Sequence, residues 1–524
     1  MASSPWTTLP TAAWTPTQYI LTALAAVVVA VLYRFSPARL DPREPPALKA
    51  SIPLIGHIIG LLRHGIDYFA RLRTAQPKKL AAATLPILNG KVYVLWDVAL
   101  IQSALRHKNL TFDLLSMEFA QRVFGLSDLA MEKLWGPEHE IESSVAPVTM
   151  HRIKGAMQGQ NLFRMNTRAL NYVADELNGL GPEGLRIPSL YRWLRDFMTM
   201  ATSEGIYGSQ NPVREDPSLI EALWEFETNM QPLFLGVLPS IIARKAVINR
   251  EKVIKALVPW YQARKDYAPD VAAITKVRAE SSREFGIPED EIGRLEMALL
   301  FVATTNTIPT LYWFTVFVLL RPQVVAEICR ETLPLVTVTT EGGRRVATVD
   351  ISKLEEQCPL MVSCYREAIR LGNQGFGTRR IMHDTVLTDG EGREYLFKAG
   401  VDMMWSAKAL HRSPETWGPD AMEFGPERFK DQEKFDRNKK HSYIPFGGGK
   451  HLCPGRNFAF AENLGFMAAL VVGFEVLGLK EGNVKLGTAI IGEAVAKPPA
   501  GAEGGEVTIK RKAGWEDVEW RFVC

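Results

Sequence analysis

One stretch decides the fold of this chain: residues 442–456, which read SYIPFGGGKHLCPGR. Three consecutive glycines, 447–449, let the backbone adopt left-handed or bulged conformations and approach a ligand closely. Cys453 follows in the same loop, and the small and apolar residues 457–473 predict a helix directly behind it. Amide N–H groups and the dipole at a helix N-terminus lower the pKa of a nearby thiol and favour the anionic sulfur that binds a metal. The stretch therefore predicts a loop built around one thiolate.

The spacing within this loop gives it a more specific meaning. Phe446, Gly449, His451, Cys453 and Gly455 form the pattern Phe-x-x-Gly-x-His-x-Cys-x-Gly, which resembles at every defined position the haem-ligand loop of the cytochrome P450 (haem-thiolate) superfamily. The resemblance implies that Cys453 is the axial ligand of a haem b (iron protoporphyrin IX) and that the loop residues bind this cofactor. A buried cysteine in a glycine turn is the alternative interpretation. Three further motifs in the family's order favour the haem loop.

Composition bounds the class of protein independently of any motif. The chain has 524 residues, 47% hydrophobic and 23% charged, so it can bury a large core. Its net charge of +3 comes from 61 basic and 58 acidic residues, without a basic run interleaved with aromatics, which argues against nucleic acid as a partner. Five cysteines without CxxC spacing favour a reducing compartment over a disulfide framework.

The N-terminus predicts a membrane anchor. The first 33 residues carry no charge, and Tyr19 to Tyr33 is an almost unbroken apolar run followed by arginines at 34, 39 and 43. The segment is long enough to span a bilayer, and the basic residues behind it place the rest of the chain on the cytosolic side. A cleaved signal peptide would need a basic region ahead of the apolar run, and there is none. We expect a single-pass protein of the endoplasmic reticulum membrane.

Three regions are therefore predicted: an anchor and its flank at 1–36, a proline-rich connector at 37–50, and a haem-thiolate catalytic domain at 51–524. Val92 to Trp96 and Thr385 to Leu387 read as short strands, whereas most other long segments show helical spacing. The expected fold class is mostly α with minor β. The family resemblance implies the cytochrome P450 fold behind an N-terminal transmembrane helix.

The longest helical pattern runs from Glu289 to Leu320 and begins behind Pro288, as helix starts prefer. It resembles the family's central helix, which passes over the haem. The usual family signature there is Ala-Gly-x-acid-Thr-Thr, and residues 302–307, VATTNT, stand at those positions. Thr305 replaces the acid and Asn306 replaces the threonine that the family uses in dioxygen activation.

This departure leaves two interpretations open. Asn306 and Thr305, with ordered water, are candidate catalytic proton carriers, since an amide both donates and accepts hydrogen bonds. The variant Ala-x-x-Asn-x-x-Pro, residues 303–309, resembles the subgroup of sterol 7α- and 12α-hydroxylases and prostacyclin synthase. Alternatively, the polar residues bond only their own backbone and bend the helix, as Pro309 also would.

A second motif is Glu-x-x-Arg, formed by Glu367 and Arg370 on a helix predicted from Leu354 to Leu371. By itself this motif usually means a solvated ion pair. Here residues 426–429, PERF, follow it and precede the cysteine loop. The resemblance implies that Glu367, Arg370 and Arg428 form a buried structural charge cluster under the loop, without contact to substrate.

Arg379 matches the family's propionate-binding arginine, and His451 is the second expected propionate partner. The adjacent Arg380 is an equally good candidate by chemistry, because either guanidinium suits a carboxylate. The ligand on the helix that covers the other propionate stays open among three residues, Trp135, His151 and Arg152.

Two surface segments have two interpretations each. The apolar residues 234–242, followed by Arg244 and Lys245, form either a loop that enters a membrane interface or an ordinary core-facing helix end. A basic group around the loop forms either a docking face for an acidic electron donor or a solvated charge run. Its members are Lys434, Arg437, Lys439, Lys440 and Lys450.

These features together predict a haem-dependent monooxygenase that oxidises a lipophilic terpenoid, sterol or polyketide of secondary metabolism. The sequence has neither a glycine-rich nucleotide loop behind a strand nor a flavin domain, so electrons would come from a separate protein. The family resemblance implies NADPH-cytochrome P450 reductase, with cytochrome b5 as a further donor. The alternative is a haem-thiolate isomerase or dehydratase that needs neither O2 nor NADPH. A membrane-bound haem carrier or sensor is the third interpretation.

Overall fold

The structure is a computed structural model that describes residues 19–24, 40–50, 56–65, 67–76, 78–87, 90–136, 140–490 and 492–524. Its helices are α2 (Ile58–His64), α3 (Asp67–Thr74), α4 (Val98–Arg106), α5 (Asp113–Phe124), α6 (Asp128–Trp135), α7 (Val145–Ala156), α8 (Gly159–Asn178), α9 (Leu190–Tyr207), α10 (Pro212–Glu215), α11 (Ser218–Asn229), α12 (Pro239–Ile242), α13 (Arg244–Gln262), α14 (Ala273–Glu284), α15 (Glu289–Thr304), α16 (Thr307–Leu319), α17 (Pro322–Thr332), α18 (Leu354–Gln357), α19 (Pro359–Gly372), α20 (Ala407–His411), α21 (Pro414–Trp417), α22 (Arg437–Ser442) and α23 (Arg456–Gly473).

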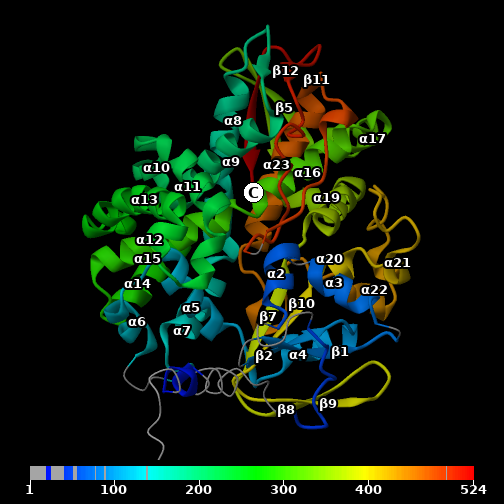
Figure 1. Cartoon of the computed structure of the whole chain (residues 1–524). Coiled ribbons are helices and arrows are strands. Elements are labelled where there is room, and N and C mark those ends of the chain that lie inside the picture. Colours follow the sequence, from blue (N-terminus) through cyan, green and yellow to red (C-terminus); the bar gives the residue numbers. More distant parts are fainter. Residues whose placement is uncertain are drawn as a thin grey trace, which may run out of the picture.

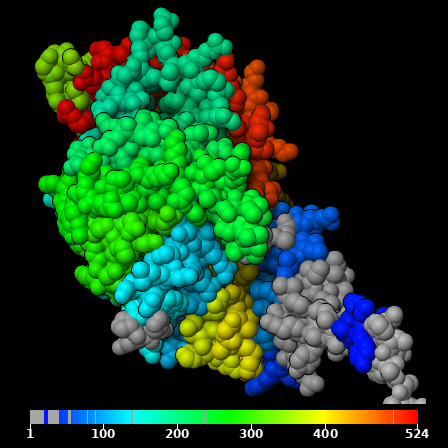
Figure 2. Space-filling model, turned by 60° about the vertical axis from the view of Figure 1, so that its left-hand side comes forward, coloured from blue at the N-terminus to red at the C-terminus, as the bar shows by residue number. Residues whose placement is uncertain are grey.

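The strands are β1 (Ala82–Ile87), β2 (Gly90–Leu95), β3 (Leu110–Thr111), β4 (Leu185–Ile187), β5 (Val336–Glu341), β6 (Arg344–Asp350), β7 (Phe376–Ile381), β8 (Thr385–Thr388), β9 (Glu394–Phe397), β10 (Asp402–Ser406), β11 (Phe474–Leu477), β12 (Val507–Arg511) and β13 (Val518–Val523). The largest sheet has the order β1-β2-β10-β7-β3. It lies with α2 to α4 at one end of the molecule, and the helices α8 to α19 and α23 fill the rest (Figure 1). Figure 2 shows the helices coloured green gathered on one side, above the blue and yellow sheet region.

Two apolar helices form the middle of the core. In α16 nearly every residue is buried, and α23 is buried along most of its length. A helix that is hydrophobic on all sides has to be surrounded by other elements. Both helices pack against α19, so the segment behind Cys453 is fixed to the helix that carries the Glu-x-x-Arg motif.

Most of the predicted elements are found. The mostly α fold with minor β is confirmed, as are strands β2 and β8 and the helix α23 behind the cysteine loop. Most of the predicted membrane anchor, including residues 25–33, lies outside the described residues. The part of the anchor that is described, residues 19–24, is helical. Within the described ranges no single helix is long and apolar enough to cross a membrane; residues 289–319 and 322–335 pass that test only as a pair bent by 108°.

Two predicted helices were wrong in their continuity. The pattern Glu289 to Leu320 forms α15 and α16, which are separate helices with a break at Thr305 and Asn306. Pro309 explains the position of the break, because it has no N–H to donate to the carbonyl four residues earlier, that of Thr305. The predicted helix 354–371 is likewise divided into α18 and α19, since Pro359 starts a new helix at its first position.

The predicted connector packs on the sheet in its described part, residues 40–50. Thr84 of β1 donates its backbone N–H to the carbonyl of Pro46 at 2.9 Å. Glu44 is buried, and its Oε2 accepts a 2.6 Å hydrogen bond from the Tyr93 hydroxyl and lies 2.5 Å from Nζ of Lys91. This part of the chain therefore belongs to the packing of the catalytic domain.

The apolar segment 234–242 is exposed at its end. Val237, Leu238 and Ile241 are 59%, 61% and 69% exposed, and Ile242 is 45% exposed. A core-facing helix end would bury these side chains. The core-facing interpretation is therefore wrong for the second half of this segment, while Phe234 at its start is partly buried against the core.

Candidate functional site

The glycines of the cysteine loop have the conformations that their sequence suggested. Gly447 and Gly449 have φ angles of 72° and 64°, in the left-handed region that favours glycine. A Cβ atom on Gly449 would lie 1.9 Å from the carbonyl oxygen of Leu105 in α4. The backbone N–H of Cys453 donates to the carbonyl of Phe446 at 3.0 Å, which closes the loop. Any side chain at Gly449 would push the loop away from α4.

The thiol of Cys453 is largely buried in this loop. Burial raises its pKa, while the N–H groups of Gly455 and Arg456 and the charge of Arg456 act in the opposite direction. The helix N-terminus thus acts in the predicted direction, and burial acts against it. A bound cation is the partner that would favour the thiolate in such surroundings.

The two neighbouring arginines of β7 point to opposite sides of the strand and have different partners. Arg380 pairs with Asp402 of β10 and lies 3.2 Å from Glu118. Arg379 is 5% exposed, and its Nε atom has no hydrogen-bond partner among the described residues. Burial lowers the pKa of Arg379 to about 10, against the effect of Asp113. Arg379 is therefore the guanidinium that fits an additional carboxylate.

Arg379 and His451 lie beside the same loop. Nη2 of Arg379 donates to the carbonyl of Gly448 at 3.4 Å. Nδ1 of His451 lies 3.4 Å from Oδ1 of Asp113, and its Nε2 accepts from the backbone N–H of Phe112 at 3.3 Å. Burial lowers the pKa of His451 to about 4, so the imidazole is neutral. The sequence analysis missed Asp113, which gives no signal of its own and lies far from His451 in the chain.

The candidates for the second propionate have different surroundings. Arg152 of α7 pairs with Glu284 at 2.6 Å, so its guanidinium is engaged with α14. His151 is exposed and Trp135 is half-buried. Lys154, two residues after Arg152, faces the loop closely enough for its charge to lower the pKa of His451.

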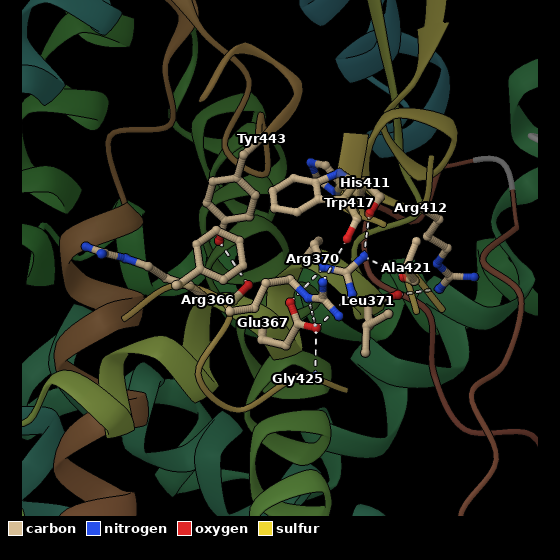
Figure 3. A network of polar contacts seen from close by, with 12 residues as sticks. Arg366, Glu367, Arg370, Leu371, His411, Arg412, Trp417, Ala421, Gly425 and Tyr443 are labelled. Atoms are coloured by element: carbon tan, nitrogen blue, oxygen red, sulfur yellow. Dashed lines mark hydrogen bonds and ion pairs between the residues drawn. The ribbon is translucent and has the colours of Figure 1, made fainter. Parts of the chain in front are cut away.

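Glu367, Arg370 and Arg428 form a buried cluster, not a solvated pair. Figure 3 shows Glu367 and Arg370 of this cluster. Nε and Nη2 of Arg370 both donate to the Glu367 carboxylate at 2.7 Å, and Nε of Arg428 donates to it at 3.0 Å. The side chains of Glu367 and Arg370 are fully buried. Nη1 of Arg370 also donates to the carbonyls of His411 and Ala421 at 2.6 Å each. The cluster ties α19 to the segment that precedes the cysteine loop.

His411 connects this cluster to the loop itself. Its Nε2 accepts a 3.1 Å hydrogen bond from the backbone N–H of Ile444, and its ring lies 5.6 Å from that of Tyr443 (Figure 3). Burial lowers the pKa of His411 to about 3, and the nearby Arg370 and Arg412 act in the same direction. The imidazole is therefore a neutral acceptor. The sequence analysis did not identify His411, because a single histidine carries no motif.

The polar side chains at the break between α15 and α16 differ in whether they bond to the backbone of their own helix. The hydroxyl of Thr305 donates to the carbonyl of Phe301 at 2.9 Å, so the interpretation of a backbone-bonded, helix-bending residue fits Thr305. Asn306 is half-buried, and Val302, one turn earlier on the same side, is 55% exposed. The hydroxyl of Thr307 is buried without a hydrogen-bond partner among the described residues. Asn306, two residues after the end of α15, is thus a polar side chain beside the exposed Val302. We call these two positions the exposed strip.

These residues fit a haem-thiolate protein: a thiol in a tight glycine loop, a buried arginine that lacks a carboxylate, and an exposed strip on an otherwise buried helix. Cys453 would hold the iron, and Arg379 with His451 would hold a propionate. A thiolate ligand supplies electron density to haem iron and favours O–O cleavage. The family model of cytochrome P450 matches residues 192–500. The chain belongs to the cytochrome P450 family.

Similar proteins agree with this assignment. A cytochrome P450 monooxygenase of Gibberella zeae is 35% identical over 509 residues, which cover 96% of this chain and 95% of that protein. The cytochrome P450 monooxygenase nodJ of Hypoxylon pulicicidum is 28% identical and covers 93% of each chain. The solved structure of retinoic acid bound cyanobacterial CYP120A1 superimposes with a TM-score of 0.64 at 18% identity, over 90% of this chain and 100% of that one. The protein is therefore a haem monooxygenase, an oxidoreductase.

The resemblance to sterol hydroxylases is seen weakly. The 7-alpha-hydroxycholest-4-en-3-one 12-alpha-hydroxylase of Oryctolagus cuniculus is 22% identical, over 83% of this chain and 87% of that protein. Enzymes of this family generally take electrons from redox partners and act on lipophilic substrates.

Proposed function

We propose that this enzyme hydroxylates or otherwise oxidises a lipophilic terpenoid, sterol or polyketide of secondary metabolism. It uses O2 and receives electrons from NADPH through NADPH-cytochrome P450 reductase, with cytochrome b5 as a further donor. The observation that carries the proposal is the exposed strip, where Val302 of α15 and Asn306, just after the end of this helix, lie on one side. The apolar side chain of Val302 suits contact with an apolar substrate. The amide of Asn306, close to it, suits the transfer of protons.

Aromatic residues next to this strip support a lipophilic substrate. The Phe301 ring, adjacent to Val302, lies 5.9 Å from that of Phe124 and 5.8 Å from that of Phe226. Phe119 extends the group, with its ring 5.8 Å from that of Phe124. Aromatic side chains offer large apolar areas and defined contact geometry. The rings of Phe301, Phe124 and Phe226 are buried, so they form apolar packing behind Val302.

The proposal predicts that Asn306→Ala uncouples the reaction. The Asn306 amide both donates and accepts, so with one water it holds the protons that dioxygen activation consumes. The variant should form at least about tenfold less product per NADPH, since one acid–base group contributes about 10²–10⁴-fold. The missing electrons should appear as hydrogen peroxide. The measurement compares product, NADPH and peroxide in microsomes that contain the reductase, with Thr310→Ser, a conservative change one helical turn further, as the control.

The same experiment separates the monooxygenase from the isomerase or dehydratase alternative. A monooxygenase requires NADPH and O2, whereas an isomerase turns over without either. For an isomerase, Asn306→Ala would change the rate or the product pattern through the position of the substrate's oxygens. Full turnover of a candidate substrate without NADPH would reject the proposed reaction.

We further propose a single-pass anchor in the endoplasmic reticulum membrane, with the catalytic domain in the cytosol. The uncharged N-terminal run supports the anchor, and the exposed side chains Val237, Leu238 and Ile241 support a second contact with the membrane interface. Arg244 and Lys245, directly behind them, suit the lipid headgroups.

Deletion of residues 1–33 tests this topology. The truncated protein should move toward the soluble fraction while it still binds haem, because the cysteine loop and its supports lie in the other part of the chain. Fractionation with and without high salt provides the measurement, and haem absorbance provides the control. A truncated protein that still behaved as an integral membrane protein would contradict a single anchor.

The electron donor is proposed to dock near the cysteine loop through basic side chains. Arg437 and Lys440 are exposed, and Lys450 is about half exposed, 3.6 Å from Asp113. Lys434 is partly neutralised by Asp431 at 2.8 Å. An acidic donor surface would meet the remaining positive charge, and salt would weaken the encounter.

A further inference from the structure

A buried lysine links the C-terminal part of the chain to helix α11. Nζ of Lys497 contacts Oε2 of Glu227 and lies 2.8 Å from Oε1 of Glu493. The three side chains are only 16%, 2% and 7% exposed. The ring centroid of Trp224, one turn before Glu227, lies 5.8 Å from Nζ. One cation therefore bridges two elements that are about 270 residues apart in the chain.

The burial of these three charged groups contributes little to stability by itself. Burial raises the pKa of Glu227 to about 7, with Lys497 acting against this change and Glu493 adding to it. Burial also disfavours the ammonium, but the two carboxylates outweigh it and raise the pKa of Lys497. Buried ion pairs contribute little net stability, because desolvation offsets their attraction. Their best-supported use is to fix one arrangement among several.

The arrangement that this cluster fixes includes the contact between Gly492 and the end of α11. Gly492 has a φ of 103°, and a Cβ atom there would lie 2.9 Å from Cε of Met230 and from the ring of Phe234. Glu227 and Met230 are three residues apart, so they lie on the same side of the helix end. The Phe234 ring in turn lies 5.5 Å from that of Phe119. The contact at Gly492 therefore continues into the aromatic group next to Phe301.

The other side of the same segment is held by uncharged hydrogen bonds. The backbone N–H groups of Gln374 and Gly375 donate to the carbonyl of Ala494 at 2.8 and 3.0 Å. The side-chain amide of Gln374 donates to the carbonyl of Gly487 at 2.8 Å. The segment is thus tied to the start of β7 on one side, and the Lys497 cluster ties it to α11 on the other.

We propose that Lys497 is a positioning residue for the substrate. It holds Gly492 against Met230 and Phe234 and so fixes the distance between α11 and the segment 487–497, which is tied to the start of β7. Without the charge, α11 and this segment separate. The apolar wall, which we define as Met230, Phe234 and Phe119, then loses its shape. The inference rests on the proposed function, because it requires a bulky lipophilic substrate that contacts this wall.

Two azoles test the inference without knowledge of the substrate. Imidazole is small and binds ferric haem iron without touching the wall, whereas clotrimazole binds the iron and needs space for three aryl rings. Spectral titration of the purified holoenzyme gives both dissociation constants. Lys497→Met should raise the clotrimazole Kd about tenfold or more and change the imidazole Kd less than about twofold, because a loosened site loses preorganised contacts. Lys497→Arg should restore most of the clotrimazole affinity.

Lys510→Met is the matched control, since Lys510 lies on β12 in an exposed pair, 3.7 Å from Glu475. It should change neither constant. If Lys497→Met does not bind haem, the triple variant with Glu227→Gln and Glu493→Gln removes the unpaired carboxylates and should show the same selective loss. An equal loss of both azoles, or no loss of clotrimazole affinity, would overturn the inference. Failure of the proposed reaction would instead appear as turnover without NADPH, which leaves the azole titrations unaffected.

Discussion

Replacing Cys453 with serine is expected to abolish the red-shifted Soret band of the reduced protein with carbon monoxide, and to abolish oxygenation. A serine hydroxyl does not ionise in this range of pH, so it cannot give the thiolate ligand that produces the band. The loop itself should survive, because its closing contact is the backbone hydrogen bond from Cys453 to Phe446, which does not involve the side chain. The spectrum of the purified variant is the measurement.

A second cysteine provides the control for this result. Cys364 of α19 is buried, its Sγ lies 3.7 Å from the carbonyl of Pro426, and burial raises its pKa. Cys364→Ser should keep the red-shifted band, since this thiol lies in the charge-cluster segment and not in the loop. An imidazole-type spectrum in the wild type, or a Cys453→Ser variant that kept the band, would contradict the assignment of Cys453.

The parts of the site that could be predicted are those in which neighbouring residues decide the structure. The loop from Phe446 to Gly455 needs left-handed glycines at fixed spacing, and the structure has them at Gly447 and Gly449. The helix behind the loop follows from its own composition. Glu367 and Arg370 are one turn apart on a single helix, so their contact also follows from spacing.

The other parts depend on contacts between distant segments. The choice between Arg379 and Arg380 required the register of β7 against β10, which places Asp402 opposite Arg380. The contacts of His411 with Ile444 and of His451 with Asp113 join segments that no local pattern connects. The same is true of the contact between Lys497 and Glu227. The sequence shows the helix N-terminus that favours the thiolate of Cys453, but it does not show the burial that acts against it.

Glu367→Gln is expected to be among the most damaging single changes in the chain. Oε1 of Glu367 accepts from Arg370, from Arg428 and from the backbone N–H of Gly425 at 2.7, 3.0 and 3.0 Å. A glutamine cannot neutralise two guanidinium groups, and one end of its amide is a donor that would face them. Removing one partner of a buried ion pair costs about 3–5 kcal/mol. A protein of ordinary stability, about 5–15 kcal/mol, would lose a large part of its margin.

The matched control is a glutamate of the PERF segment, next to Arg428. Glu427 is 71% exposed and lies 3.6 Å from Lys430, so Glu427→Gln should change stability by less than about 1 kcal/mol. The two variants are compared by thermal unfolding and by haem bound per polypeptide. Glu367→Gln should lower both, whereas the fraction that still folds should show the thiolate-type spectrum and the wild-type imidazole Kd, because the cluster supports the loop without touching the ligand. A stable Glu367→Gln protein with an altered spectrum would instead show that Glu367 acts on the iron ligand directly.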